Sequence, residues 1–329
     1  NISSKVYKYH MKILAVQSKM GIGDTIIFLP FIKGLYNKFN SPVSLLTKES
    51  SKADQYLDQT NYIDKILHLE RDVHNNKHSG FIGSLKLIKD LKKYNFDKIF
   101  IFNSSVRFYL IARFSGIPQI YQYPLFRKSD QHIFDTPKKF IKDKINLDIH
   151  EDPEIQIRND LVKAAVNKFE INQNEINILL GIGGSGPTKR VPANIYLSII
   201  EKILKIKKSK FFLATGKSQE EQLILKVILN SKFKDNCIPL DNFSIKETLP
   251  IIKNCNLSIC NDSSFSHLSA ALNVKTITLM VDTPLIYGNY SSKMFPIIPE
   301  GEITVNHHTD GKEKINPQEV CNKVFEILD

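Results

Sequence analysis

The stretch LSICNDSSFSHLSAAL, residues 257–272, decides the predicted fold. Its first four residues are a short apolar run, which is typical of a buried parallel strand. Its last five are small or apolar and favour a helix, so the polar residues 261–267 occupy a strand-to-helix turn. The first N–H groups of a helix lack intrahelical partners and carry partial positive charge. Such a turn is a ready site for an anion such as a diphosphate.

Four side chains of this turn are candidate binding groups: Asp262, Ser263, Ser264 and His267. The two serines can cap the helix and still face a ligand. A carboxylate repels phosphate, so we expect Asp262 to bind sugar or ribose hydroxyls instead. The alternative is a well-capped helix whose histidine has only structural partners, and the turn by itself leaves both interpretations open.

Length and composition favour a globular protein of two domains, with 329 residues, 42% of them hydrophobic and 24% charged. No apolar run approaches the roughly 20 residues of a membrane span. Residues 1–10 are polar and lack the apolar core of a signal peptide. Four cysteines show neither metal-site spacing nor a disulfide framework, which favours a reduced, cytoplasmic protein.

The net charge of +11 comes largely from lysines spread over segments such as 86–93 and 202–210. Such lysines either form solvated helix faces or attract an anionic partner, which would be a phosphorylated substrate, an anionic membrane surface or nucleic acid. Because no motif with interleaved aromatic residues is present, we expect no nucleic-acid partner.

Strand-like runs alternate with amphipathic segments almost throughout. Predicted strands lie at 12–17, 43–47, 65–69, 98–102, 119–121, 176–182, 210–215, 237–240, 257–260 and 276–280. Predicted helices lie at 24–39, 51–58, 81–94, 106–114, 159–169, 193–205, 219–229, 245–254, 265–272 and 316–328, and the range 126–152 is predicted to be irregular. This alternation predicts an α/β fold with doubly wound parallel sheets, whose ligands bind beyond the carboxyl ends of the strands.

A polar run at 172–175 suggests a linker between two similar halves. We therefore expect a first Rossmann-like domain over 11–170 and a second over 175–315. A terminal helix over 316–329, capped by Asn316 with Pro317 at its first position, is expected to pack back on the first domain. Two such halves imply a cleft, which is a common place for a ligand.

A glycine-containing turn, Gly21-Ile22-Gly23-Asp24, follows the first predicted strand. Asp24 is predicted as the cap of the next helix, and capping alone would explain it. The other interpretation is a general base. The helix N-terminus would lower the basicity of this carboxylate, so a base working on a sugar hydroxyl would gain from partial desolvation.

The second glycine-rich segment is GIGGSGPTKRVP, residues 181–192. It matches the dinucleotide pattern G-x-G-x-x-G only weakly, because Pro187 follows at once and the next helix begins near Pro192. With Ser185, Thr188, Lys189 and Arg190 it is either a phosphate cradle or a flexible solvent loop. His74 and His78 have the helical spacing of metal ligands but lie in a polar segment, and we expect no metal site there.

Together these motifs resemble glycosyltransferase family 9, the ADP-heptose:lipopolysaccharide heptosyltransferases. The resemblance covers most of the chain from Met11. The matching pieces are Gly23-Asp24 followed by Pro30, then TKRVP at 188–192, NDSSFSHLSAAL at 261–272 and DTP at 282–284.

This resemblance implies a GT-B architecture, with two Rossmann-like domains facing across a cleft, the acceptor on the first and the nucleotide-sugar on the second. It implies inverting transfer with neither metal nor cofactor, from a donor substrate such as ADP-heptose. Asp24 matches the family's base. The residues matching its donor site are Ser185, Thr188, Lys189, Glu221, Phe243, Asp262, Ser263, Ser264 and His267. Among them, Lys189 and Ser185 match groups beside the diphosphate, Phe243 one beside the nucleotide base and Glu221 one that reaches the ribose.

The chain departs from the family at Val191, where tryptophan is usual, at Ser264, where glycine is usual, and at 280–282. These departures affect the donor sugar more than the fold. The basic surface favours an anionic glycolipid or glycan as acceptor and a peripheral contact with the inner face of a membrane.

Three other functions remain open from the sequence: a nucleotide-sugar epimerase of the same architecture, a non-catalytic sugar-nucleotide or carbohydrate-binding module, and a nicotinamide dehydrogenase. The dehydrogenase fits least well, because Glu201 falls inside a predicted helix and not at the end of a second strand.

Overall fold

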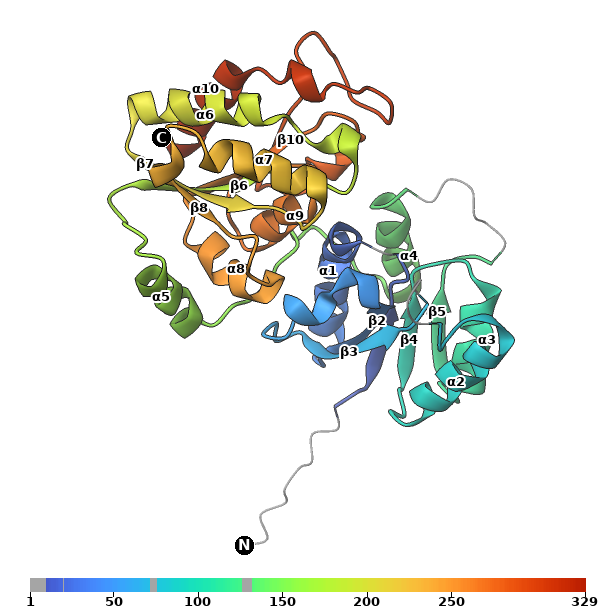
Figure 1. Ribbon diagram of the computed structural model, residues 1–329. Helices are drawn as coiled ribbons and strands as arrows, with labels where there is room; N and C mark the ends of the chain where they lie inside the picture. The colour runs from blue at the N-terminus through green and yellow to red at the C-terminus, as the bar shows by residue number, and fades with distance from the viewer. Residues whose placement is uncertain (1–9, 20, 72–75, 126–131) are drawn as a thin grey trace, which may run out of the picture. The chain divides into compact units, whose positions relative to one another are not determined.

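The computed structural model describes residues 10–19, 21–71, 76–125 and 132–329. The chain forms two compact units, one ending at Glu151 and one running from Asp152 to Asp329, and each is built on one parallel sheet (Figure 1). The predicted α/β class with two parallel sheets is therefore confirmed. None of the described helices combines the length and the apolar character needed to cross a membrane.

The sheet of unit 1 has five strands in the order β3-β2-β1-β4-β5. The strands are β1 (Ile13–Val16), β2 (Val43–Lys48), β3 (Ile63–Leu69), β4 (Lys98–Ile101) and β5 (Gln119–Gln122). The helices are α1 (Ile22–Phe39), α2 (Gly80–Lys92), α3 (Val106–Phe114) and α4 (Asp135–Ile145). β1 is central and wholly buried, which agrees with its continuous apolar sequence.

Helices cover both faces of this sheet. α2 and α3 bury Leu87, Leu91 and Phe108 against one face. α1 and α4 pack together on the other face, where Phe140 of α4 contacts the rings of Phe102 and Tyr123. Each helix uses one apolar stripe, as expected for helices flanking a parallel sheet.

Two predictions for unit 1 are wrong. The range 51–58 does not form a helix but lies over two 3-10 turns, Glu49–Ser51 and Ala53–Gln55. The range 126–152, predicted to be irregular, contains α4; its residues 126–131 lie outside the described part of the chain. The lysines of α4 mask a narrow apolar stripe made by Pro137, Phe140 and Ile141.

The sheet of unit 2 has six strands in the order β11-β10-β9-β6-β7-β8. The strands are β6 (Ile176–Gly181), β7 (Ser209–Ala214), β8 (Cys237–Pro239), β9 (Leu257–Asn261), β10 (Thr276–Leu279) and β11 (Met294–Ile297). The helices are α5 (Asn159–Lys168), α6 (Ala193–Ile206), α7 (Gln219–Leu229), α8 (Ile245–Lys253), α9 (Ser264–Ala271) and α10 (Pro317–Leu328). β11 was not predicted.

The helices of unit 2 also lie on both faces of their sheet. α6, α7 and α10 cover one face and α8 and α9 the other (Figure 1). α10 packs on α6 and β10 of its own unit, and Lys202 Nζ donates to Gln318 Oε1 at 2.8 Å. The four cysteines are buried free thiols.

The boundary between the units differs from the predicted one. α5 was assigned to the first domain, but it groups with unit 2 and packs on α8. Asn254 Nδ2, at the end of α8, donates to the carbonyl of Val162 in α5 at 2.9 Å. α10, which was expected to pack on the first domain, also groups with unit 2 and packs on α6 and β10 there.

Candidate active site

The strand order defines one special position in each sheet. In unit 2 the chain moves outward from β6 through β7 and β8, and then returns to place β9, β10 and β11 on the other side. In unit 1 the corresponding point lies between β1 and β4. In doubly wound sheets, ligands bind beyond the carboxyl ends of the strands at this switch point. The loops after β6 and β9 carry the glycine-rich segment and the 261–267 turn, so these two groups of predicted donor residues lie next to each other there.

Asn261 holds these two loops together. Its side chain is fully buried. Its amide nitrogen donates to the carbonyls of Ile182 and Gly183 at 3.0 and 3.1 Å, and its Oδ1 accepts from the Tyr196 hydroxyl at 2.8 Å. Two carbonyls at the start of the glycine-rich loop and the Tyr196 hydroxyl of α6 are thereby satisfied in the interior. Sequence reasoning missed this role, although a polar residue at the end of an apolar strand was a usable signal.

Lys189 and Asp262 form an ion pair between the two loops. Lys189 Nζ lies 2.8 Å from Asp262 Oδ2. The Asp262 carboxyl is only 6% exposed, and burial alone would raise its pKa, but the nearby His267 and Lys189 outweigh burial and hold the pKa below its usual value. The carboxylate is therefore ionised. The Lys189 ammonium is partly exposed and has three donors, of which Asp262 takes one.

His267 faces the other oxygen of the same carboxylate. Its Nε2 lies 3.8 Å from Asp262 Oδ1, and its Nδ1 lies 2.6 Å from the hydroxyl of Tyr290. The two rings are stacked with centroids 5.6 Å apart. Burial raises the pKa of Tyr290 well above its usual value, so its hydroxyl keeps its proton and can donate it to Nδ1. The His267 ring therefore lies between the Tyr290 hydroxyl and the Asp262 carboxylate.

The N-terminus of α9 has its cap residue at Ser263, but the Ser263 hydroxyl does not cap it. The expectation that both serines cap the helix is wrong: Ser263 Oγ is buried without a hydrogen-bond partner among the described residues, and Ser264 is already the first helical residue. The Ser263 carbonyl instead accepts from Ser266 Oγ at 2.7 Å. The positive end of the helix dipole is thus not neutralised by a serine cap.

Glu221 braces the glycine-rich loop against the loop after β7. Its Oε1 accepts from the N–H groups of Gly184 and Gly216 at 3.1 and 3.3 Å, and its Oε2 accepts from Ser218 Oγ at 2.7 Å. Burial raises the pKa of this carboxyl, but these hydrogen bonds outweigh it and the net shift is downward. A Cβ at Gly183 would lie 2.5 Å from Glu221 Oε1, so a larger residue there would push the Glu221 carboxylate away from the loop.

The remaining residues of the glycine-rich loop divide into two groups. Ser185 and Thr188 are exposed. Arg190, expected in the phosphate cradle, turns back on the loop: its Nε donates to the Gly184 carbonyl at 2.9 Å and its Nη1 pairs with Glu220. Arg190 therefore fixes the loop conformation, and Lys189 is the cation directed to the 261–267 turn. Val191, one of the departures from the family pattern, is buried in the core.

Phe243 lies in the loop after β8, two strands from β6 along the same sheet edge. It is half-buried and contacts the ring of Phe169 edge-on at 5.3 Å, with Lys168 Nζ 4.9 Å from its ring centroid. It offers one aromatic surface at the carboxyl edge.

Asp24 lies at the corresponding edge of unit 1, after β1. It was predicted as the helix cap, but α1 begins at Ile22 with Gly21 as its cap, so Asp24 is the third helical residue. Its Oδ2 accepts from the Gly21 N–H at 3.1 Å, and its carbonyl accepts from Gln17 Nε2 at 3.1 Å. The carboxylate is half-buried and has acceptor capacity left for a substrate hydroxyl.

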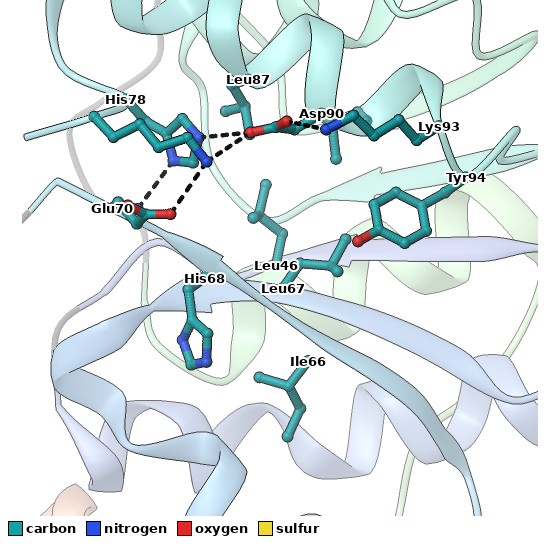
Figure 2. Close-up of a pocket in the computed structure, with 12 residues that line it drawn as sticks. Leu46, Ile66, Leu67, His68, Glu70, His78, Leu87, Asp90, Lys93 and Tyr94 are labelled. Carbon is teal, nitrogen blue, oxygen red and sulfur yellow. Dashed lines mark hydrogen bonds and ion pairs between the residues drawn. The ribbon is translucent and has the colours of Figure 1, made fainter.

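A second group of titratable residues lines a pocket of about 320 Å³ between β3 and α2 of unit 1 (Figure 2). His78 Nε2 lies 3.4 Å from Asp90 Oδ2, and its Nδ1 accepts from the Glu70 N–H at 3.1 Å. Asp90 also pairs with Lys93 at 2.7 Å and Lys77 at 2.9 Å, and these contacts hold its pKa well below its usual value. These charges balance one another, which indicates a structural brace.

The structure therefore gives His78 a carboxylate partner in Asp90 and an N–H donor in Glu70. His74, its proposed companion, lies outside the described residues. Within the described ranges, no three histidine, cysteine or acidic side chains gather closely enough to hold a metal ion.

Comparison with known proteins gives three findings. The sequence pattern of the family described as Glycosyltransferase family 9 (heptosyltransferase) matches residues 84–314. The chain is 25% identical to lipopolysaccharide heptosyltransferase 1 of Campylobacter coli, over 96% of this chain and 98% of that protein. Solved structures with the same fold include a glycosyltransferase family 9 protein of Veillonella parvula, with a TM-score of 0.76 and 18% identity over 97% of both chains.

The ADP-heptose LPS heptosyltransferase II of E. coli is a further structural neighbour. It has a TM-score of 0.71 and 17% identity, over 97% of this chain and 98% of that chain. These likenesses confirm the GT-B fold class predicted from the sequence.

Proposed function

Because the chain belongs to glycosyltransferase family 9 and is a glycosyltransferase, we propose that it transfers heptose from ADP-heptose or a related nucleotide-sugar. The acceptor is a hydroxyl group of a lipopolysaccharide core or a related anionic glycan. The relatives named above support heptose as the sugar and ADP as the nucleotide.

The observation that carries this proposal is the arrangement at the switch point of unit 2. The partly exposed ammonium of Lys189 lies beside the 261–267 turn, where the N-terminus of α9 has no serine side-chain cap. A cation and a helix N-terminus together favour a diphosphate. Asp262 directs Lys189 through a 2.8 Å contact. The exposed hydroxyls of Ser185 and Thr188, the Glu221 carboxylate and the Phe243 ring complete the proposed donor site with phosphate, ribose and base contacts.

The proposed reaction is a direct displacement. An acceptor hydroxyl oxygen attacks the anomeric carbon, and the bond from that carbon to the diphosphate oxygen breaks with inversion. Asp24 takes the hydroxyl proton, and the nucleoside diphosphate leaves with the electron pair. Lys189 and the N–H groups at the start of α9 stabilise the charge that develops on the diphosphate, so no metal ion is needed.

The net charge of the protein bears on the chemical nature of the acceptor and on where the acceptor is held. A net charge of +11 favours an acceptor rich in phosphate and carboxylate, carried on a glycolipid at the inner face of the membrane, which the enzyme contacts peripherally.

A thermal-shift panel of ADP-, GDP- and UDP-sugars on wild type and Lys189→Ala tests the proposed donor site. A ligand at 100 times its dissociation constant stabilises a fold by about 2.7 kcal/mol, a readily measured shift. We expect ADP compounds to stabilise wild type and to lose most of that effect in Lys189→Ala. If a nucleotide other than ADP raises the melting temperature instead, ADP-heptose is not the donor. If ADP compounds stabilise wild type and Lys189→Ala equally, Lys189 does not contact the donor.

A further inference from the structure

Unit 1 carries an exposed apolar surface that the proposed transfer reaction does not use. Among the described residues, eleven large apolar side chains are markedly exposed, and seven of them lie on α2 and α3. The seven are Phe81, Ile82, Leu85, Val106, Tyr109, Leu110 and Phe114. Phe81, Ile82 and Phe114 are 80%, 69% and 61% exposed. We call this set, with the exposed basic residues between its members, the α2–α3 surface.

The two helices form one continuous surface. They lie side by side (Figure 1), and Arg107 Nε of α3 donates to Ser84 Oγ of α2 at 2.8 Å. α3 buries Phe108, Ile111 and Ala112, while Val106, Tyr109 and Leu110 line its outward face. The outward face of a surface helix is normally polar, so apolar residues on both faces point to a second apolar partner.

The charge of this surface is of one sign. Its exposed basic residues are Lys86, Lys89, Lys92, Lys93 and Arg113. The only acidic residue of α2 and α3 is Asp90, and it is engaged by Lys77 and Lys93. Exposed apolar residues among unbalanced lysines are the composition of a helix face that lies in the interface of an anionic bilayer. The apolar groups enter the acyl boundary and the lysines contact lipid headgroups.

We propose that the α2–α3 surface docks unit 1 on an anionic lipid bilayer. This inference deepens the peripheral contact proposed above and rests on it. Phe81 and Val106 stand in the first turns of their helices, at the same sheet edge as Asp24. The loops after β1 and β4 are joined there by Asn103 Nδ2 donating to Ser18 Oγ at 3.2 Å. Docking would therefore bring the edge that bears Asp24 toward a lipid-anchored acceptor.

A second copy of the chain is the competing occupant, and the charges oppose it. A two-fold contact through this surface would bring together two faces that both carry Lys86, Lys89 and Arg113, with no exposed carboxylate on either helix to pair with them. Like charges brought together across an interface are strongly unfavourable. An anionic bilayer can pair its headgroups with the lysines and bury the apolar side chains.

Co-sedimentation of the full chain with phosphatidylcholine vesicles, with and without phosphatidylglycerol, tests the proposal. We expect wild type to bind only the anionic vesicles and to be released by salt, which screens the lysines. Phe81→Gln with Leu85→Gln, and separately Lys86→Glu with Lys89→Glu, should each lower the partition coefficient about fivefold or more. Glutamine keeps helix propensity high, so α2 should still form.

The matched control is Leu223→Gln with Val227→Gln, an exposed apolar pair with the same spacing on α7 of unit 2. It should bind vesicles as wild type does. Equal losses in the control and the α2 pairs, or unchanged binding in both α2 variants, would overturn the proposal. So would a dimer, seen by light scattering, that Phe81→Gln with Leu85→Gln dissociates.

The readout is independent of the transfer reaction. If wild type fails to bind vesicles but is still thermally stabilised by nucleotide in a Lys189-dependent way, the docking surface is wrong and the proposed donor site stands. If vesicle binding depends on the α2 residues but no nucleotide raises the melting temperature, the proposed donor site is wrong and the docking surface stands.

Discussion

Replacing Lys189 by methionine separates two roles of one ammonium group. In the structure Lys189 neutralises the buried carboxylate of Asp262 at 2.8 Å, and it is also the cation proposed to hold the donor diphosphate. Methionine keeps most of the side-chain length and removes the charge. We therefore expect a loss of stability, from the uncompensated Asp262, and a separate loss of donor affinity.

The structure sets the size of each effect. Removing one partner of a buried ion pair typically costs about 3–5 kcal/mol. His267 Nε2 remains 3.8 Å from the other oxygen of Asp262 and Lys189 is partly exposed, so we expect about 1–3 kcal/mol here. The lost charge-assisted hydrogen bond to the diphosphate is worth about 1.5–3 kcal/mol, or about 10- to 150-fold in affinity.

Adding Asp262→Asn to Lys189→Met distinguishes the two losses. The neutral amide removes the uncompensated charge, so urea unfolding should show that most of the lost stability returns. Calorimetric titration with the donor nucleotide should show no recovery of affinity, because the cation is still missing. Recovery of donor affinity in the double variant, or wild-type affinity in Lys189→Met, would refute the assignment of Lys189 to the diphosphate.

Three further predictions follow from individual contacts. Asp24→Asn can still accept from the Gly21 N–H, so it should lower turnover about 10²–10⁴-fold while donor affinity stays unchanged; near-normal turnover in a steady-state assay would remove Asp24 as base. Asn261→Ala removes the donor to the buried carbonyls of Ile182 and Gly183 and leaves the Tyr196 hydroxyl only the longer 3.4 Å contact to the Gly181 carbonyl, so it should lower the free energy of unfolding in urea by about 2–4 kcal/mol; a change within error would show that the loop is anchored otherwise. The pKa of Glu221 is lowered from its ordinary value of 4.5, so the ionised carboxylate stabilises the folded state fully above pH 4.5 and progressively less at lower pH. The stability difference between wild type and Glu221→Gln should therefore shrink below pH 4.5 in a pH series of unfolding curves, and a constant difference would contradict the hydrogen-bonded carboxylate.

Most of the helices and strands could be predicted because their apolar patterns are strong. β11 was missed because its four residues include Pro296, which lacks an N–H, and such a segment is tolerated only at an edge, where β11 lies. α4 was missed because lysines on all but a narrow stripe hide its periodicity. The 3-10 turns near residue 51 were predicted as a helix, since a short segment leaves helix and turn indistinct.

The residues of the candidate site could be predicted from the sequence, but the contacts between them could not. Sequence motifs placed Lys189 and Asp262 on two loops, and only the adjacency of β6 and β9 brings them together. Arg190 was expected to face a phosphate because the sequence does not reveal that the Gly184 carbonyl and Glu220 engage it. The position of Asn261 at the end of an apolar strand indicated a buried polar contact, but its partners, from the glycine-rich segment and from α6, could not be identified from the sequence.

Transfer of the sugar itself tests the central claim most directly. Wild type and Asp24→Asn are incubated with ADP-heptose and a lipopolysaccharide core that lacks heptose, and the masses of both products are measured. We predict that wild type yields an acceptor enlarged by one heptosyl unit together with free ADP, and that Asp24→Asn yields neither at a comparable rate. Conversion of the donor sugar without acceptor would indicate an epimerase, and no consumption of any nucleotide-sugar despite nucleotide binding would indicate a binding module; either result would contradict the proposed transfer.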